Sequence, residues 1–127
     1  MNGTELEASL GGFTGTECYH KLSPLHLGLV VTDGVLFLAQ EAKAFWLIDA
    51  IASHQPKCRK DASLRDFQFW TLDVAEDHSA VLKCERDTDD VAITQRIPYT
   101  DFPMKQVRVW VQPSDERTWV ALLPSEH

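Results

Sequence analysis

The segment "DFQFWTLDV" (residues 66–74) decides which architecture this chain can adopt. Its apolar side chains recur every second residue, first Phe67 and Phe69, then Trp70, Leu72 and Val74. A spacing of two is that of a β-strand, whose successive side chains point to opposite faces. Before residue 64 the apolar residues follow helical spacing instead, so the segment marks the change from a helical half to a stranded half.

The spacing of two continues from residue 66 toward the C-terminus. It returns in "AVLKCE", "VAITQRI", "VRVWV" and "RTWVALL", and the intervening polar segments have the length of hairpin turns. We therefore expect an antiparallel sheet of about five strands within residues 66–123. Its solvent-exposed positions are marked by four charged side chains: Lys83, Glu85, Arg96 and Arg108.

Two helices are expected upstream, at about residues 4–11 and about residues 33–54. Thr32 or Asp33 is a suitable N-cap for the second. The apolar pattern there is compatible with one long helix or with two helices that break near residues 41–43. A helical N-terminal half packed on one face of the sheet gives an α+β fold with two layers.

Length and composition indicate one domain, residues 1–127, and a cytoplasmic location. A chain of 127 residues with 44% hydrophobic residues can bury a core that needs no disulfide or metal. Its three cysteines are odd in number and widely spaced, which is typical of reduced thiols. No apolar run is long enough to span a bilayer, and the N-terminal residues include two Glu where a signal peptide carries basic residues.

The charge of the chain is negative and unevenly distributed. Nineteen acidic residues against 12 basic ones give a net charge of −7, which disfavours direct binding to nucleic acid. Residues 73–90 contain seven acids and two bases, a local net charge of −5. Either these acids are ordinary residues of solvent-exposed turns, or they form a surface that attracts a basic partner. The candidate partner-binding residues are Glu76, Asp77, Glu85, Asp87, Asp89 and Asp90.

Asp49 lies in the most apolar helical segment, "FWLIDAIASHQ" (residues 45–55). In a helix His54 would lie five residues on and about 140° around the axis, so the two do not form a ready acid/base pair. A carboxylate buried there needs a hydrogen-bonded partner. We expect Asp49 to be a buried, paired residue that fixes the helix in place, with a catalytic role as the alternative.

Three other candidate sites are less well supported by the sequence. A metal set can be assembled on paper from Cys18, His20, His54 and Cys58, but the spacing matches no zinc motif, so we expect no metal and no cofactor. In "YTDFP" (residues 99–103), Asp101 is expected to shape a turn, with ligand contact by Tyr99 and Asp101 as the alternative. No arrangement of residues points to a catalytic nucleophile.

Several segments together resemble a known family. They are "FTGTE" (13–17), "TDGV" (32–35), "WLIDAIASHQ" (46–55), "FQFW" (67–70), "YTDFP" (99–103) and "LLPSE" (122–126). The family consists of small bacterial and mobile-element proteins, from phages and plasmids, and is catalogued as a domain of unknown function. The resemblance implies one intact domain and no particular catalytic residue. The occurrence around phages implies a role in host interaction, such as inhibition of a defence complex by an anti-CRISPR protein.

These observations lead to two hypotheses. The first is a non-enzymatic interaction domain that binds through its acidic surface or a sheet edge. Its partner is a host protein, a nucleic-acid-binding complex or a second copy of the chain, with no membrane involved. A homodimer that pairs an exposed strand such as residues 117–123 is compatible with this hypothesis and with the second one. The second is a small enzyme or ligand-binding domain with a pocket between helix and sheet, around Asp49 and Tyr99 and with His54 close by.

Overall fold

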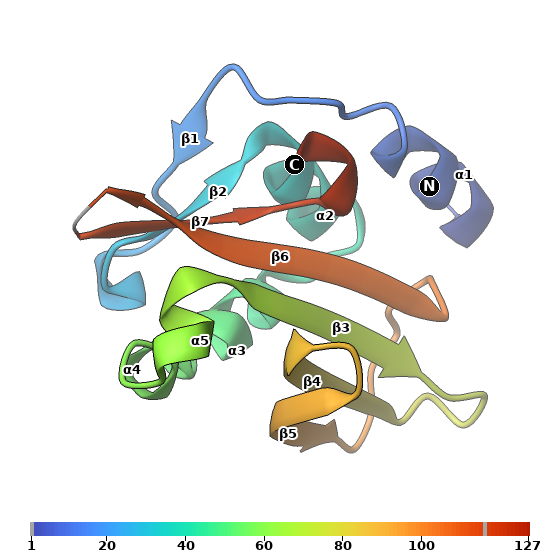
Figure 1. The fold of residues 1–127 in the computed structure, drawn as a ribbon. Helices are drawn as coiled ribbons and strands as arrows, with labels where there is room; N and C mark the ends of the chain where they lie inside the picture. The colour runs from blue at the N-terminus through green and yellow to red at the C-terminus, as the bar shows by residue number, and fades with distance from the viewer. Residues whose placement is uncertain (1, 116) are drawn as a thin grey trace.

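The computed structural model describes residues 2–115 and 117–127, and its centre is one mixed sheet (Figure 1). Within these residues the sheet has seven strands in the order β1-β2-β7-β6-β3-β4-β5. Neighbouring strands are antiparallel except β2 and β7, which are parallel. The strands are β1 (Tyr19–His20), β2 (Leu29–Thr32), β3 (Gln68–Val74), β4 (Ala80–Asp87), β5 (Asp90–Ile97), β6 (Gln106–Asp115) and β7 (Thr118–Leu122).

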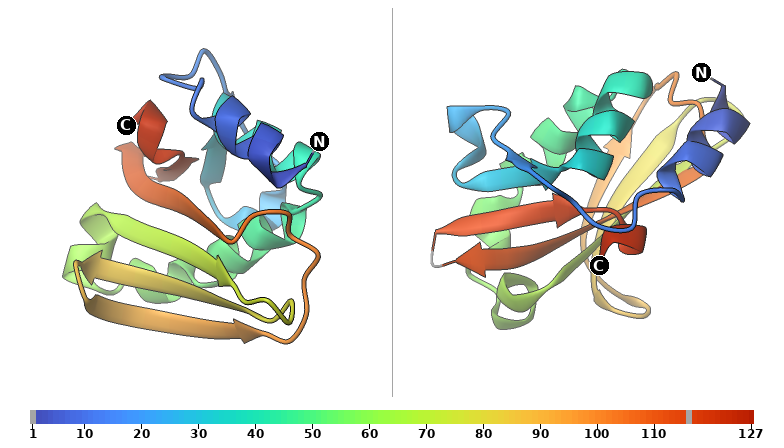
Figure 2. Two further views of the ribbon diagram at one scale, coloured as in Figure 1. Left: turned by 90° about the vertical axis from the view of Figure 1, so that its right-hand side faces the viewer. Right: turned by 90° about the horizontal axis from the view of Figure 1, so that it is seen from above.

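Five α-helices accompany the sheet in the described part of the chain, so the predicted α+β class is confirmed. They are α1 (Gly3–Leu10), α2 (Asp33–Glu41), α3 (Phe45–Ser53), α4 (Gln55–Cys58) and α5 (Ala62–Asp66). Short 3₁₀ turns occupy Pro24–His26 and Pro124–Glu126. Figure 2 shows α2 and α3 on one side of the sheet.

The sheet has more strands than the five or so predicted, and one of its strand pairs is parallel. Strands β3 to β7 lie within the predicted range, but the N-terminal half adds β1 and β2. The β-branched residues of "LVVT" suit a strand, and Val30 of β2 pairs with Val120 of β7. As a result β7 has neighbours on both sides, so residues 117–123 offer no free strand for a homodimer. The edge strands of the sheet are β1 and β5.

The predicted helix at residues 33–54 is two helices. Thr32 is the N-cap of α2, and its hydroxyl oxygen accepts a hydrogen bond from Val35 N. Lys43 has a φ of 52°, which lies in the left-handed region and ends the run of helical residues. The chain restarts at Phe45, and α3 then buries Leu47 and its apolar neighbours.

The sheet has an inner face, toward α2 and α3, and an outer face. Inner-face residues such as Trp70 and Leu72 of β3 and Leu82 of β4 are each 1% exposed. The alternate residues point to the outer face, where register places Phe69 between Glu85 of β4 and Trp110 of β6. The four charged residues expected at exposed positions all share this outer face: Lys83, Glu85, Arg96 and Arg108.

Two buried glutamines join the inner face to the helices. Gln55 of α4 and Gln68 of β3 are fully buried, and each side-chain amide donates to the carbonyl oxygen of the other, at 2.9 and 3.0 Å. Trp70 Nε1 donates to the same Gln68 oxygen at 2.8 Å. Buried amides are costly without partners, so this exchange of hydrogen bonds fixes how α4 docks on the sheet.

Three segments that are distant in the sequence meet at the N-terminus of α2. The Glu126 carboxylate accepts hydrogen bonds from the Thr32 hydroxyl at 2.6 Å and from Gly34 N at 3.2 Å. Asp33 accepts from Glu17 N at 3.0 Å and lies 2.8 Å from His20 Nε2. A Cβ atom at position 34 would lie 2.6 Å from the Glu126 carboxylate and 2.7 Å from a Leu123 methyl group, so a larger residue there would displace both side chains. The segments "FTGTE", "TDGV" and "LLPSE" therefore serve the fold.

Candidate functional site

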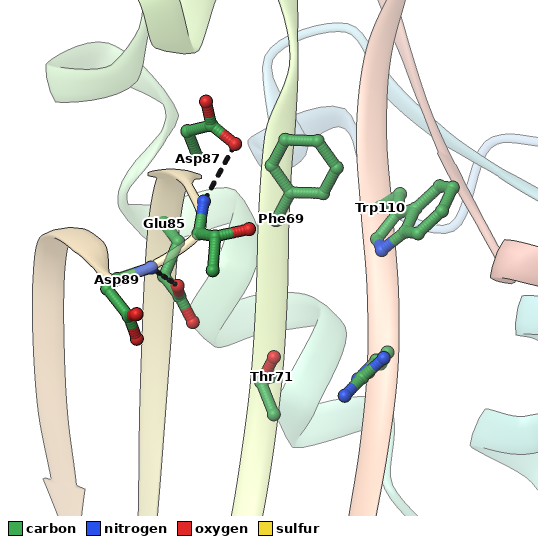
Figure 3. Close-up of a pocket in the computed structure, with 8 residues that line it drawn as sticks. Phe69, Thr71, Glu85, Asp87, Asp89 and Trp110 are labelled. Carbon is green, nitrogen blue, oxygen red and sulfur yellow. Dashed lines mark hydrogen bonds between the residues drawn. The ribbon is translucent and has the colours of Figure 1, made fainter.

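The outer face of the sheet is hollowed beside the turn that joins β4 to β5 (Figure 3). The hollow has a volume of about 300 Å³. Its walls come from β3, β4, the turn and β6, and they combine aromatic, acidic, hydroxyl and basic groups. The lining residues are Phe69, Thr71, Glu85, Asp87, Thr88, Asp89, Arg108 and Trp110.

Aromatic rings form one wall of the hollow. The Phe69 and Trp110 rings meet edge to face, with centroids 5.5 Å apart at 80°. Phe67 packs against both, at 4.6 Å from Phe69 and 5.6 Å from Trp110, and His127 lies 5.4 Å from Trp110. Such contacts hold the rings in a fixed arrangement, so the wall is preformed.

Three carboxylates form the opposite wall. Glu85 Oε2 accepts from Asp89 N at 2.9 Å, and Asp87 Oδ1 accepts from Thr88 N at 2.8 Å, as the dashed lines in Figure 3 show. Asp89 has a φ of 61°, which turns the chain sharply from β4 into β5. A carboxylate has two oxygens and about four acceptor sites, so each of these residues can shape the turn and still bind a ligand.

Basic groups border the hollow unequally. Lys83 lies 3.8 Å from Glu85 and 3.9 Å from Asp73, so its charge is compensated within the sheet. Arg108 lies across β3 from Lys83, because Thr71 pairs with both residues. Among residues 2–115 and 117–127, no carboxylate lies within ion-pair distance of Arg108. The hollow therefore has an acidic side and, two strands away, the Arg108 cation, which no carboxylate in the described part of the chain compensates.

The six predicted partner-binding acids do not form one surface. Glu85, Asp87 and Asp89 line the hollow, but Glu76 and Asp77 lie in the β3–β4 turn. That turn is at the other end of β4, about 26 Å away for eight residues of strand. The separation follows from the hairpin itself, because the turn before a strand and the turn after it lie at opposite ends of that strand.

Two of these acids are also engaged in the fold. Asp77 accepts hydrogen bonds from the Ser79 hydroxyl and Ser79 N, and these bonds lower the pKa of its carboxyl group. Asp90 lies 3.2 Å from Arg86, whose guanidinium also contacts Asp61 at 2.8 Å. Asp77 and Asp90 are therefore structural residues in part.

Asp49 is not buried, which contradicts the prediction. Its side chain is 68% exposed, because α3 turns Leu47, Ile48 and Ile51 toward the core instead. It does have a partner, since Oδ1 lies 2.7 Å from His26 Nε2 in the Pro24–His26 turn. His26 is the buried member, with a side chain that is 7% exposed. Sequence reasoning missed this pair because nothing local links the two segments.

The structure does not gather the other candidates into a site. His54 Nε2 lies 2.7 Å from Gln95 Oε1, and its ring packs 5.6 Å from Trp70. Tyr99 is 67% exposed, beside His78. In "YTDFP" it is the Thr100 hydroxyl that accepts from Phe102 N, while Asp101 is exposed. None of Asp49, His54, Tyr99 and Asp101 lines the outer-face hollow or the two further hollows beside α1.

The four residues considered as metal ligands, Cys18, His20, His54 and Cys58, are likewise not brought together. His20 is bound to Asp33, Cys18 is exposed, and Cys58 is buried against Cys84 of β4. In the part of the chain that the structure describes, no three His, Cys, Asp or Glu side chains are grouped so that they could hold a metal ion. None of the helices described is long and apolar enough to cross a membrane.

Sequence reasoning also missed the aromatic half of the hollow. Phe69 belongs to the apolar pattern of residues 66–74, and Trp110 lies within the predicted strand "VRVWV"; apolar residues in strands usually face the core. A signal was present, because both alternate with the inward-facing Trp70 and Val109. They share the outer face with Glu85 and Arg108, two positions that had been recognised as exposed.

Comparison with known proteins identifies the family and nothing closer. No curated protein and no solved structure matches the chain. A family model, described as a family of unknown function (DUF6876), matches residues 4–127. That match spans the sheet, the helices and the hollow, and it confirms the resemblance to a domain of unknown function. The chain belongs to the family of unknown function DUF6876.

Proposed function

We infer that this protein is a non-enzymatic interaction domain that binds a positively charged segment of a partner protein in the outer-face hollow. One observation carries this proposal: the hollow sets the rings of Phe69 and Trp110 against the carboxylates of Glu85, Asp87 and Asp89. Aromatic faces attract ammonium and guanidinium groups by about 0.5 to 2 kcal/mol. Carboxylates add charge complementarity and accelerate the encounter with a basic surface.

The charge of the chain indicates the kind of partner. With a net charge of −7, the domain repels phosphate and attracts proteins whose binding sites are lined by Lys and Arg. A host complex that handles nucleic acid, such as a CRISPR effector, presents such a site. The resemblance to small bacterial and mobile-element proteins adds a bacterial or phage origin to this proposal, with action in the cytoplasm and inhibition of a host defence complex as the outcome of binding.

The enzyme alternative receives less support from the geometry. A catalytic or ligand-binding pocket around Asp49 and Tyr99 requires both side chains to converge on a cavity. Both are about two-thirds exposed, and they contact different partners, His26 and His78. The hollow on the outer face is a better candidate because its groups do converge.

The test compares two sets of acids on one scaffold. A triple variant, Glu85→Gln, Asp87→Asn and Asp89→Asn, retains acceptor atoms for the turn but removes three charges from the hollow. Titration calorimetry with a short Lys- and Arg-rich peptide should show affinity weakened about tenfold or more, and wild-type affinity that falls with added salt.

The control is Glu76→Gln, which removes one charge beyond the far end of β4 and is matched to the single variant Glu85→Gln in the hollow. Because it changes the net charge by only one and lies outside the hollow, it should leave the peptide affinity within about twofold of the wild-type value. Equal affinity in the triple variant and the wild type, with both folded by circular dichroism, would contradict the proposal. The same pair of variants can then be compared in capture of a partner from host lysate.

A further inference from the structure

We propose that the hollow binds the C-terminal residue of a partner chain when that residue is lysine or arginine. The side-chain cation lies at the acidic turn, and the terminal carboxylate lies at Arg108. This inference rests on the proposed function, because it specifies the ligand of the same hollow. It starts from the one lining residue that a purely cation-binding site does not explain, which is Arg108.

The strand register fixes where the two charges of the hollow lie. Glu85, Phe69 and Trp110 form one row across β4, β3 and β6, and Arg108 lies on β6 in the next outer-face row. Two strand spacings and two residues along the strand separate the Cα atoms of Glu85 and Arg108 by about 12 Å. Both residues line the hollow, and a single long residue with a charge at each end can reach from one to the other.

Arg108 would oppose the binding of a simple cation. Its charge is uncompensated among the described residues, and two like charges in one small hollow repel each other. The repulsion becomes an attraction if the ligand carries a carboxylate at that end, because guanidinium binds carboxylate through two parallel hydrogen bonds. The acidic turn and Arg108 together are therefore complementary to a ligand with both charges.

Lysine and arginine at a chain terminus have this pattern within one residue. Their long apolar stems can lie along the Phe69 and Trp110 rings while the cation reaches the carboxylates. The volume of about 300 Å³ is at the lower end of the range for small-ligand sites, so it suits one residue better than a long segment. A terminal residue also needs only one path for the chain to leave.

The experiment uses two peptides that differ in one group. One is Gly-Ser-Gly-Arg with a free C-terminal carboxylate, and the other is the same peptide with a C-terminal amide. Titration calorimetry on the full chain should show the amide binding about tenfold or more weakly. Arg108→Gln should weaken binding of the free-acid peptide by a similar factor and leave the amide unchanged or slightly tighter.

The control and the contrary outcomes separate this inference from the proposed function. Arg96→Gln removes the same charge from the same face, outside the hollow, and should change neither affinity by more than about twofold. Equal binding of the two peptides, or tighter binding of the free acid to Arg108→Gln, would overturn the C-terminal inference. If Glu85→Gln nevertheless weakens the binding of both peptides, the proposed cation binding stands and only the C-terminal inference fails. If neither peptide binds the wild type, both proposals fail.

Discussion

Gln68 and Trp70 of β3 face the helices, and Phe69 and Thr71, which alternate with them, face the other way. On the inner side the polar atoms of Gln55, Gln68 and Trp70 bond to one another within the domain. On the outer side aromatic rings and carboxylates line a hollow instead. The polar groups of the inner face are thus fully used within the fold, while the outer face leaves aromatic rings and carboxylates open to a ligand, and that is where binding is proposed.

The largest expected effect comes from comparing the tryptophans of the two faces. Trp70 is 1% exposed, so Trp70→Ala should lower the free energy of unfolding by about 3–5 kcal/mol. Trp110 is half-buried, and Trp110→Ala should cost roughly 1–2 kcal/mol, mainly ring contacts with Phe67 and Phe69. Urea unfolding measures both losses, and equal losses would show that the outer face is also core.

The second expected effect concerns the buried amides. Gln55→Leu or Gln68→Leu alone leaves the other amide without its partner, at a cost of about 1–3 kcal/mol. The double variant should lose less than the sum of the two, because neither amide is then left unpaired. Thr94→Val, at an exposed outer-face position of β5, should change stability by less than about 0.5 kcal/mol. Strict additivity in the double-mutant cycle would contradict the pairing.

Much of this two-faced arrangement is encoded locally. The spacing of two predicts β3 to β7 from the sequence alone, and the charges of Lys83 and Arg108 indicate which face of the sheet is exposed. The start of α2 follows from the Thr32 cap. Strand β2 is only four residues long, and its parallel partner β7 lies some 90 residues away. Local periodicity contains no information about such a distant pairing.

The candidate site was predictable only in part, for a similar reason. Acidic residues stand out in a sequence, so Glu85, Asp87 and Asp89 were recognised. Phe69 and Trp110 did not stand out, because alternating aromatic residues in a strand are usually core. The pair of His26 and Asp49 depends on a contact between a 3₁₀ turn and α3. The hydrophobic pattern of the segment predicts a buried Asp49, whereas the side chain is exposed.

The smallest expected effect is a change in the stability of the domain at acidic pH. It concerns the ion pair of Arg86 and Asp61, which holds the end of β4 against the start of α5. Arg86 lies between Glu85 and Asp87 but reaches Asp61, the N-cap of α5, with its Nε and Nη2 atoms 2.9 and 2.8 Å from the Asp61 carboxylate. This hydrogen bond, together with one from Leu64 N, lowers the pKa of Asp61 below its ordinary value of 3.8. The folded state therefore favours the ionised carboxylate.

The sign of the pH dependence follows from that lowered pKa. The contribution of Asp61 is fully present above its unfolded pKa of about 3.8 and is lost as pH falls through the lower folded value. Asp61→Asn should therefore flatten the fall in stability below about pH 4, as measured by urea unfolding at several pH values. Arg86→Gln should flatten it similarly, and the double variant should add little, because the two residues act as one pair. A profile for Asp61→Asn that runs parallel to the wild type would show that the acidic turn is not anchored through this pair.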